Sequence, residues 1–307
     1  MSINFHTVNN FNDELYDFLS EVEAPHNDVR LVGGNLTIGI GFDLIEGGSV
    51  VRKAVYKALG IEVDLLASGA GTAAQRNAEQ GYINSLDAAI QAGNIAQLHT
   101  IMAQRAADGT LNGFANQRHA TFEFWDKSGN GNTEDEMIVA LNGALPYYKN
   151  EVSDILFGAP LAWQTYQDPN GTPFSTSREC IALLSLAWNA GPGIVGPRLR
   201  SAILNNNRAE AWFEIRYQSN RVGNLVARGQ QLNANDFQSY NRNFDMGWAK
   251  RRYYESQVFG LYDDAPQNAD EEFLKVMRTF ARTVTKMPIM MFGVDWGWKH
   301  LERISSW

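Results

Sequence analysis

Hydrophobic and polar residues repeat with the helical period over most of this chain. In residues 11–23, Leu15, Phe18, Leu19 and Val22 lie three or four positions apart and share one helix face, and Pro25 follows as a stop signal. The stretch from 50 to about 122 is also helix-like, with breaks at 69–71 and at Gly109. The same period predicts further helices over 134–157, 177–190, 195–205, 208–217, 247–260 and 270–287.

One segment has a strand pattern instead. Residues 29–42 place β-branched and apolar residues on both sides of a Gly33-Gly34-Asn35 turn, which is typical of a β-hairpin. Gly39 and Gly41 alternate within the second strand, and glycine inside a strand often marks the close approach of a ligand or another backbone. We therefore expect a mainly α (α+β) fold with one small N-terminal hairpin that presents an open glycine face.

The segment 177–190 indicates a helix in the core. It is almost uninterruptedly apolar from Ile181 to Trp188, as expected of a helix buried on every side. Thr176 and Glu179 have the spacing of a capping box at its start. Its cysteine, Cys180, is the single one in the chain, and we expect a buried free thiol.

Composition excludes several classes of function. The 307 residues are 44% hydrophobic and carry a net charge of −8, without a stripe of Lys and Arg, so a nucleic-acid partner is not expected. No segment reaches the ~20 apolar residues of a membrane span. The first residues lack the basic and apolar regions of a signal peptide, which predicts synthesis in the cytoplasm. We expect a monomer that needs no metal and no cofactor.

Two carboxylates and a hydroxyl stand out around the hairpin. Glu23 ends the first helix four residues after Leu19, at the edge of the apolar face, where a partly desolvated carboxyl group can act as a general acid. Glu21 is the alternative, although its helical angle points away from that face. Thr37 lies in the hairpin and Asp43 just beyond it. Paired carboxyl groups that flank a glycosidic bond are the usual hydrolytic arrangement.

Several separated segments resemble one enzyme family. The sequence LSEVEA at 19–24, followed after a loop by GNLTIGIG at 34–41, is similar to the catalytic region of the phage-type lysozymes of glycoside hydrolase family 24. Three later segments resemble further helices of that family in the same order, at 132–156, 182–195 and 249–260.

The resemblance implies a role for individual residues. Glu23 matches the catalytic acid, Thr37 the threonine that positions water, and Arg251 the arginine that pairs with the glutamate, with Arg252 as the adjacent alternative. The family's usual aspartate lies six residues before the threonine, where this chain has Leu31. Muramidase domains of pesticin-like bacteriocins and secreted antibacterial effectors carry it six residues after the threonine, which corresponds to Asp43.

Three further positions complete the candidate site. Asp28 lies near the usual aspartate position and is the alternative to Asp43. Asn189, in the segment that resembles the family's central helix, and His26, in the loop after Pro25, are candidate substrate-binding or supporting residues.

The resemblance also implies a fold and an activity. We expect a lysozyme-like two-lobed domain in which 1–45 carries the catalytic residues, 46–131 is a helical insertion, 132–262 is the helical lobe and 263–307 is a C-terminal extension. Such an enzyme, found among phage endolysins, bacteriocins and toxin effectors, cleaves the β-1,4 bond between N-acetylmuramic acid and N-acetylglucosamine in peptidoglycan. Its substrate lies outside the cytoplasm, which implies delivery by injection, secretion or lysis and an immunity or delivery protein as partner. The alternative is a degenerate muramidase-like domain that binds peptidoglycan or a partner.

Overall fold

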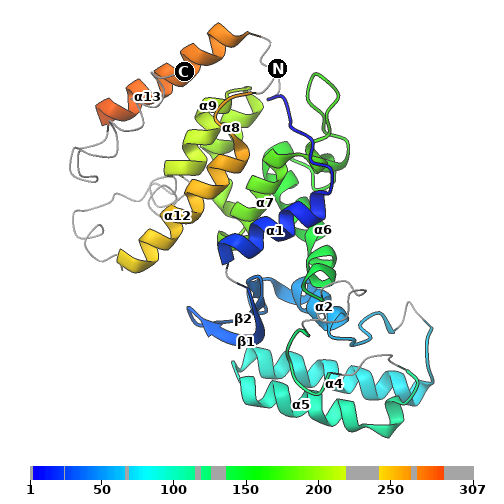
Figure 1. Cartoon of the computed structure of the whole chain (residues 1–307). Coiled ribbons are helices and arrows are strands. Elements are labelled where there is room, and N and C mark those ends of the chain that lie inside the picture. The colour runs from blue at the N-terminus through cyan, green and yellow to red at the C-terminus, as the bar shows by residue number, and fades with distance from the viewer. Residues whose placement is uncertain are drawn as a thin grey trace. The chain divides into compact units, whose positions relative to one another are not determined.

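The computed structural model describes residues 3–23, 25–65, 69–114, 119–125, 136–218, 242–263 and 268–286. Within these ranges the chain is mainly helical and contains one three-stranded antiparallel sheet (Figure 1), which confirms the predicted mainly α (α+β) class. None of the described helices has the length and apolar character needed to cross a bilayer.

The predicted elements agree closely with the observed ones, and the first helix has the predicted bounds. The described helices and strands are α1 (Phe11–Glu23), β1 (His26–Val32), β2 (Asn35–Gly39), β3 (Phe42–Asp43), α2 (Gly48–Ala58), α4 (Ala73–Gln91), α5 (Ile95–Ala107), η1 (Gly109–Leu111), α6 (Glu136–Phe157), η2 (Ala162–Gln164), η3 (Phe174–Thr176), α7 (Arg178–Ala190), η4 (Pro192–Ile194), α8 (Pro197–Leu204), α9 (Arg208–Phe213), η5 (Glu214–Gln218), α12 (Arg242–Phe259) and α13 (Ala269–Lys286).

The chain folds into two compact units, each assembled from separate stretches. The first, which we call the sheet unit, consists of Thr7–Tyr166 and Pro173–Val195. The second, the helical unit, consists of Met1–His6, Gln167–Thr172 and Gly196–Trp307. The predicted helical lobe, 132–262, therefore contributes α6 and α7 to the sheet unit and α8, α9 and α12 to the helical unit.

The core of the sheet unit is built around α7. Its residues from Glu179 to Trp188 are all buried, and α1 packs against both α6 and α7. The helix is capped by Ser177, whose Oγ accepts a hydrogen bond from the Cys180 backbone N at 3.1 Å. The predicted capping box on Thr176 was wrong because Thr176 belongs to η3, and Ser177 is the extended residue directly before the helix. Cys180 is buried and free, as predicted.

The predicted insertion, 46–131, begins with a helix that belongs to this core. Helix α2 packs along α6, and a Cβ at Gly143 of α6 would lie 2.9 Å from the Ala54 Cβ of α2. Glycine at this position therefore allows the two helices to approach closely.

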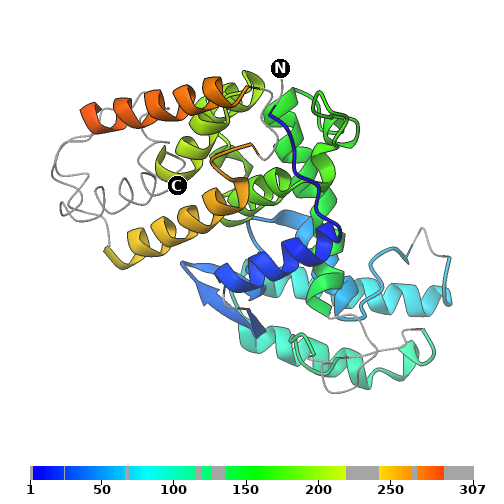
Figure 2. The ribbon, with the colours of Figure 1, turned by 45° about the horizontal axis from the view of Figure 1, so that its top comes forward.

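Helices α4 and α5 lie side by side as an antiparallel pair (Figures 1 and 2). A capping box at Thr72 starts α4, and the Asn94 side chain caps α5. Between them, Arg105 and Glu79 form a fully buried ion pair with an N–O distance of 2.6 Å. The Arg105 guanidinium also donates to the Gly60 carbonyl oxygen at 2.8 Å, which links the pair to the end of α2.

In the helical unit, the buried side chain of Arg208 joins distant parts of the chain. Its guanidinium donates to the carbonyl oxygen of Phe259 at 2.6 Å and to that of Asn4 at 2.5 Å. Asp168 accepts a hydrogen bond from the Phe5 backbone N at 2.7 Å. These contacts attach the two short stretches of this unit to its helices.

Candidate active site

The register of the sheet separates a buried face from a polar face. The turn between β1 and β2 is formed by Gly33 and Gly34, both with positive φ (61° and 98°), as predicted for a tight hairpin. On β2 and β3, Leu36, Ile38 and Phe42 are fully buried. The residues that alternate with them along each strand point to the other face of the sheet.

That polar face carries Asn35, Thr37 and Asp43. Thr37 and Asp43 are directly paired across β2 and β3, and such partners place their side chains on the same face. Asn35, two residues before Thr37, shares this face and donates its amide N–H to Asp43 Oδ2 at 2.6 Å.

Gly39, the last residue of β2, and Gly41, in the turn to β3, do not form the predicted open face. Gly39 has φ +68°, and a Cβ there would lie 2.8 Å from the ring of Phe124, which covers it. Gly41 has φ +88°, and a Cβ there would lie 3.4 Å from Cδ of Glu23. The prediction was wrong because side chains of the protein itself approach this backbone, where positive φ also favours glycine.

Glu23 therefore lies against the turn that joins the strands of Thr37 and Asp43. It is the last residue of α1 and is half-buried. The indole of Trp188 adjoins the same place, since its Nε1 would lie 3.5 Å from a Cβ at Gly41. Trp188 Nε1 also donates to the Ile40 carbonyl oxygen at 2.9 Å, which fixes the turn. Glu21 is exposed on α1, in agreement with its predicted orientation.

Asp43 is held by three N–H donors. Its Oδ1 accepts hydrogen bonds from the backbone N of Ile45 (2.8 Å) and Glu46 (2.7 Å), and its Oδ2 accepts the bond from Asn35. The Oγ1 of Thr37, on the opposite strand, is buried and has no hydrogen-bond partner among the described residues. A buried hydroxyl without a partner is costly, and such groups occur at functional sites.

An aromatic pair lies behind the turn. Tyr148 of α6 packs on Trp188 with ring centroids 4.7 Å apart, and Trp188 meets the Phe42 ring edge to face at 5.0 Å. Burial, followed by the charges of Tyr147 and Asp43, raises the pKa of Tyr148 above its ordinary value. The Tyr148 hydroxyl therefore stays protonated in the electrostatic field of Asp43.

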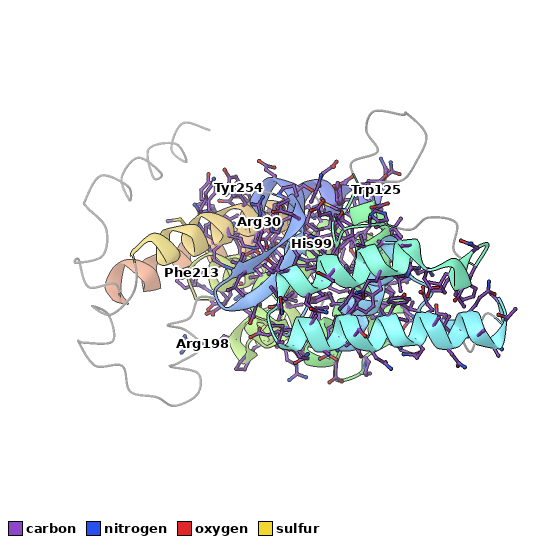
Figure 3. All side chains as sticks on the ribbon, turned by 90° about the horizontal axis from the view of Figure 1, so that it is seen from below. Arg30, His99, Trp125, Arg198, Phe213 and Tyr254 are labelled. Atoms are coloured by element: carbon purple, nitrogen blue, oxygen red, sulfur yellow. The ribbon has the colours of Figure 1, made fainter. Side chains whose placement is uncertain are left out.

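Asp28, the alternative second carboxylate, has a different environment on β1. Its Oδ1 pairs with Arg30 (labelled in Figure 3), whose Nη2 lies at 2.9 Å and whose Nε lies at 3.0 Å. This hydrogen bond lowers the pKa of Asp28 below its ordinary value. His26 begins the same strand, and its Nδ1 donates to the Asp28 carbonyl oxygen at 2.6 Å. Leu31, at the family's usual aspartate position, is 60% exposed.

The remaining candidates lie on two helices. Asn189 is half-buried in the last turn of α7, directly after Trp188. Arg251 lies in α12 of the helical unit, where its Nε donates to Glu255 Oε1 at 3.0 Å. Arg252 also pairs with Glu255, on its other oxygen, at 2.5 Å. Both candidate arginines therefore share a buried carboxylate, and the pairing of Arg251 with Glu23 stays a prediction.

Sequence reasoning missed Asn35, Trp188 and Glu255 as site or partner residues. Asn35 could have been found, because period-two alternation places it on the face of Thr37. Glu255 could have been found from its spacing of three and four residues to the two arginines. No group of three or more His, Cys, Asp and Glu residues suited to a metal ion occurs in the part of the chain that the structure describes.

The geometry thus unites a half-buried glutamate, a strand-paired threonine and aspartate, and a supporting amide in the sheet unit. A glutamate, an aspartate and a hydroxyl are the types of group required for acid–base hydrolysis of a glycosidic bond. No protein-family model, curated protein or solved structure matches this chain.

Proposed function

We propose that this chain is a peptidoglycan hydrolase of the lysozyme type, an N-acetylmuramidase with antibacterial or cell-lytic action. The observation that carries the proposal is the position of the Glu23 carboxyl group, whose Cδ would lie 3.4 Å from a Cβ at Gly41, in the turn between the strands of Thr37 and Asp43. The end of α1 therefore lies beside the turn that joins the strands of the other two residues named by the resemblance.

In the proposed reaction, Glu23 gives its proton to the glycosidic oxygen as the bond to the anomeric carbon breaks. Thr37 and Asp43 hold a water molecule on the opposite face of the sugar, and Asp43 takes a proton from it as the water oxygen bonds to the anomeric carbon. This water-mediated route inverts the anomeric centre and requires the carboxyl groups to be about 6.5–9.5 Å apart.

The proposal includes the rest of the family assignment. Arg251 or Arg252 would orient Glu23, and Asn189 and His26 would bind or support the glycan. The two-lobed lysozyme architecture, with 46–131 and 263–307 as additions to it, belongs to the same proposal. The partner is the peptidoglycan strand, reached after injection, secretion or lysis, and an immunity or delivery protein is the second partner.

The test is digestion of purified peptidoglycan, followed by reduction of the products with borohydride. A muramidase leaves N-acetylmuramic acid at the new reducing end, so reduction yields its alcohol. Glu23→Gln should abolish release, whereas Glu21→Gln is the matched control, because Glu21 is exposed on the same helix two residues earlier. Wild-type protein that releases no such ends would refute the hydrolase, and a fully active Glu23→Gln variant would refute Glu23 as its catalytic acid.

Two further variants decide the second carboxylate. Asp43→Asn should remove activity. Asp28→Asn should retain it, because Asp28 lies on β1, away from the strand of Asp43, and its carboxylate is paired with Arg30. The opposite pattern would assign the role to Asp28.

A second candidate function has one observation in its favour. Both hydrogen bonds to Asp43 Oδ1 come from the backbone of the following turn, as they would if this carboxylate were only a turn cap. The degenerate muramidase-like domain would then bind insoluble peptidoglycan or a partner without cleaving glycan. Sedimentation of the protein with peptidoglycan, with no new reducing ends, would identify this outcome.

A further inference from the structure

We propose that Asn35 is a positioning residue for Asp43, a role that rests on the proposed function. Asn35 is the first residue of β2 and is half-buried. Its Nδ2 lies 2.6 Å from Asp43 Oδ2, across the strand pair that also carries Thr37. An amide that bonds a carboxylate is a charge-assisted donor, which makes it stronger than a bond between neutral groups.

The hydrogen bonds to Asp43 come from two separate elements. The backbone N–H groups of Ile45 and Glu46 occupy Oδ1 from the turn that follows β3, and Asn35 occupies Oδ2 from β2. Among the described residues, Asn35 supplies the side-chain donor of this set. Without it, the carboxylate would be held at one oxygen only and could tilt about its Cβ–Cγ bond.

The three hydrogen bonds also determine which lone pair of the Asp43 carboxylate is left without a donor. A carboxylate offers about four lone-pair directions. The three donors use both directions on Oδ1 and one on Oδ2, which leaves the second direction on Oδ2. All three donors are N–H groups that can only donate.

Thr37 shows why this remaining position matters. It lies on the same face between Asn35 and the turn, and its Oγ1 is buried without a described partner. A water molecule at the remaining position of Oδ2 would lie on the strand face that carries Thr37, and the Thr37 hydroxyl, which is buried, would have to turn toward it to form a second bond. In the proposed reaction, Asn35 thereby determines where Asp43 accepts the proton of the attacking water.

The experiment compares Asn35→Ala and Asn35→Asp with a matched control, Asn27→Ala. Asn27 is an exposed asparagine on β1 of the same sheet, and its carbonyl oxygen, which bonds Phe124 N, is kept in the variant. We expect Asn35→Ala to lower kcat for peptidoglycan by roughly 10- to 100-fold, in the range found when a catalytic group is misplaced. KM and the melting temperature should change little, and Asn27→Ala should behave as wild type.

Asn35→Asp gives a readout that a structural role would not move. Two carboxyl groups at hydrogen-bond distance share one proton, so the acid limb of the pH profile of kcat/KM should move to higher pH.

The outcomes separate this proposal from the proposed function. If Glu23→Gln is inactive but Asn35→Asp keeps the wild-type pH profile, the positioning role is wrong and the hydrolase stands. If the wild type cleaves no glycan, the hydrolase is wrong and the positioning role falls with it.

Discussion

Substitution of Gly41 by alanine tests whether Glu23 is placed by the β2–β3 turn. The added Cβ would lie 3.4 Å from Glu23 Cδ and 3.5 Å from Trp188 Nε1. The distance to Trp188 is an ordinary van der Waals contact, whereas the distance to Glu23 Cδ lies at the edge of the tight range, in which the neighbouring group gives way by a few tenths of an ångström. The variant should therefore remain folded while its glutamate is displaced.

Two other glycines calibrate the expected stability. Gly34 has a similar φ of +98° with no atom within 4 Å of an added Cβ, so Gly34→Ala measures the backbone strain alone. That strain costs about 1–2 kcal/mol. Gly39→Ala adds an overlap of the new Cβ with Phe124 at 2.8 Å, which should cost a further ~1–3 kcal/mol as overpacking. We expect Gly41→Ala to resemble Gly34→Ala, and Gly39→Ala to be the least stable.

The glycine variants should rank differently in activity than in stability. Because a 1 Å misplacement can cost ~100-fold in rate, a few tenths of an ångström predicts about a 3- to 10-fold loss in Gly41→Ala. Gly34→Ala should keep wild-type activity at a temperature where all variants are folded.

Urea denaturation gives the free energy of unfolding, and release of reducing ends from peptidoglycan gives the rate. If Gly34→Ala loses as much activity as Gly41→Ala, the loss reflects backbone strain. Gly41 would then have no part in making room for Glu23.

Three further predictions concern the buried core. Trp188→Phe removes the donor to the Ile40 carbonyl oxygen, which leaves a buried acceptor unpaired, and urea denaturation should show a loss of about 1–3 kcal/mol. Glu79→Ala leaves the buried Arg105 without its counter-charge and should cost about 3–5 kcal/mol in the same measurement; a loss below 1 kcal/mol would contradict the buried pair. Burial raises the pKa of Cys180 to about 12, above the ordinary thiol value, so the native state keeps its proton between pH 9 and 12 whereas the unfolded state loses it. The contribution of this thiol to the free energy of unfolding is complete below pH 9 and is lost as the pH rises to 12. Urea denaturation should therefore give a lower free energy of unfolding at pH 10 than at pH 8, and a Cys180→Ser variant should lack this part of the decrease.

The local patterns of the sequence predicted local structure well. The bounds of α1 follow from apolar spacing and from Pro25, and both signals lie within the segment itself. The hairpin turn at Gly33 and Gly34 is equally local, because two positive φ angles require the residues that the sequence provides. The same holds for the helical core from Ile181 to Trp188, although its cap moved by one residue to Ser177.

The partners of the candidate site could not be predicted in the same way. The pattern at Gly39 and Gly41 indicates that something approaches the backbone, but it does not say what approaches. Phe124 reaches Gly39 from a distant segment, and Glu23 reaches Gly41 because the chain turns back after α1. The predicted open glycan surface failed for this reason. The pairing of Thr37 with Asp43 was not predicted either, because it depends on a short third strand, Phe42–Asp43, where the sequence indicated only the end of the hairpin.

The discontinuous make-up of the two units determines how the chain can be divided. It passes between the units after His6, Tyr166, Thr172 and Val195. A cut after Val195 would therefore yield a fragment that still carries two stretches of the helical unit, separated from the Arg208 side chain that bonds Asn4. Truncation at that point would expose polar backbone that Arg208 normally satisfies. The first fragment would hold two stretches of the fold of the second, so the helical unit could form only when both fragments are supplied together, as in fragment complementation.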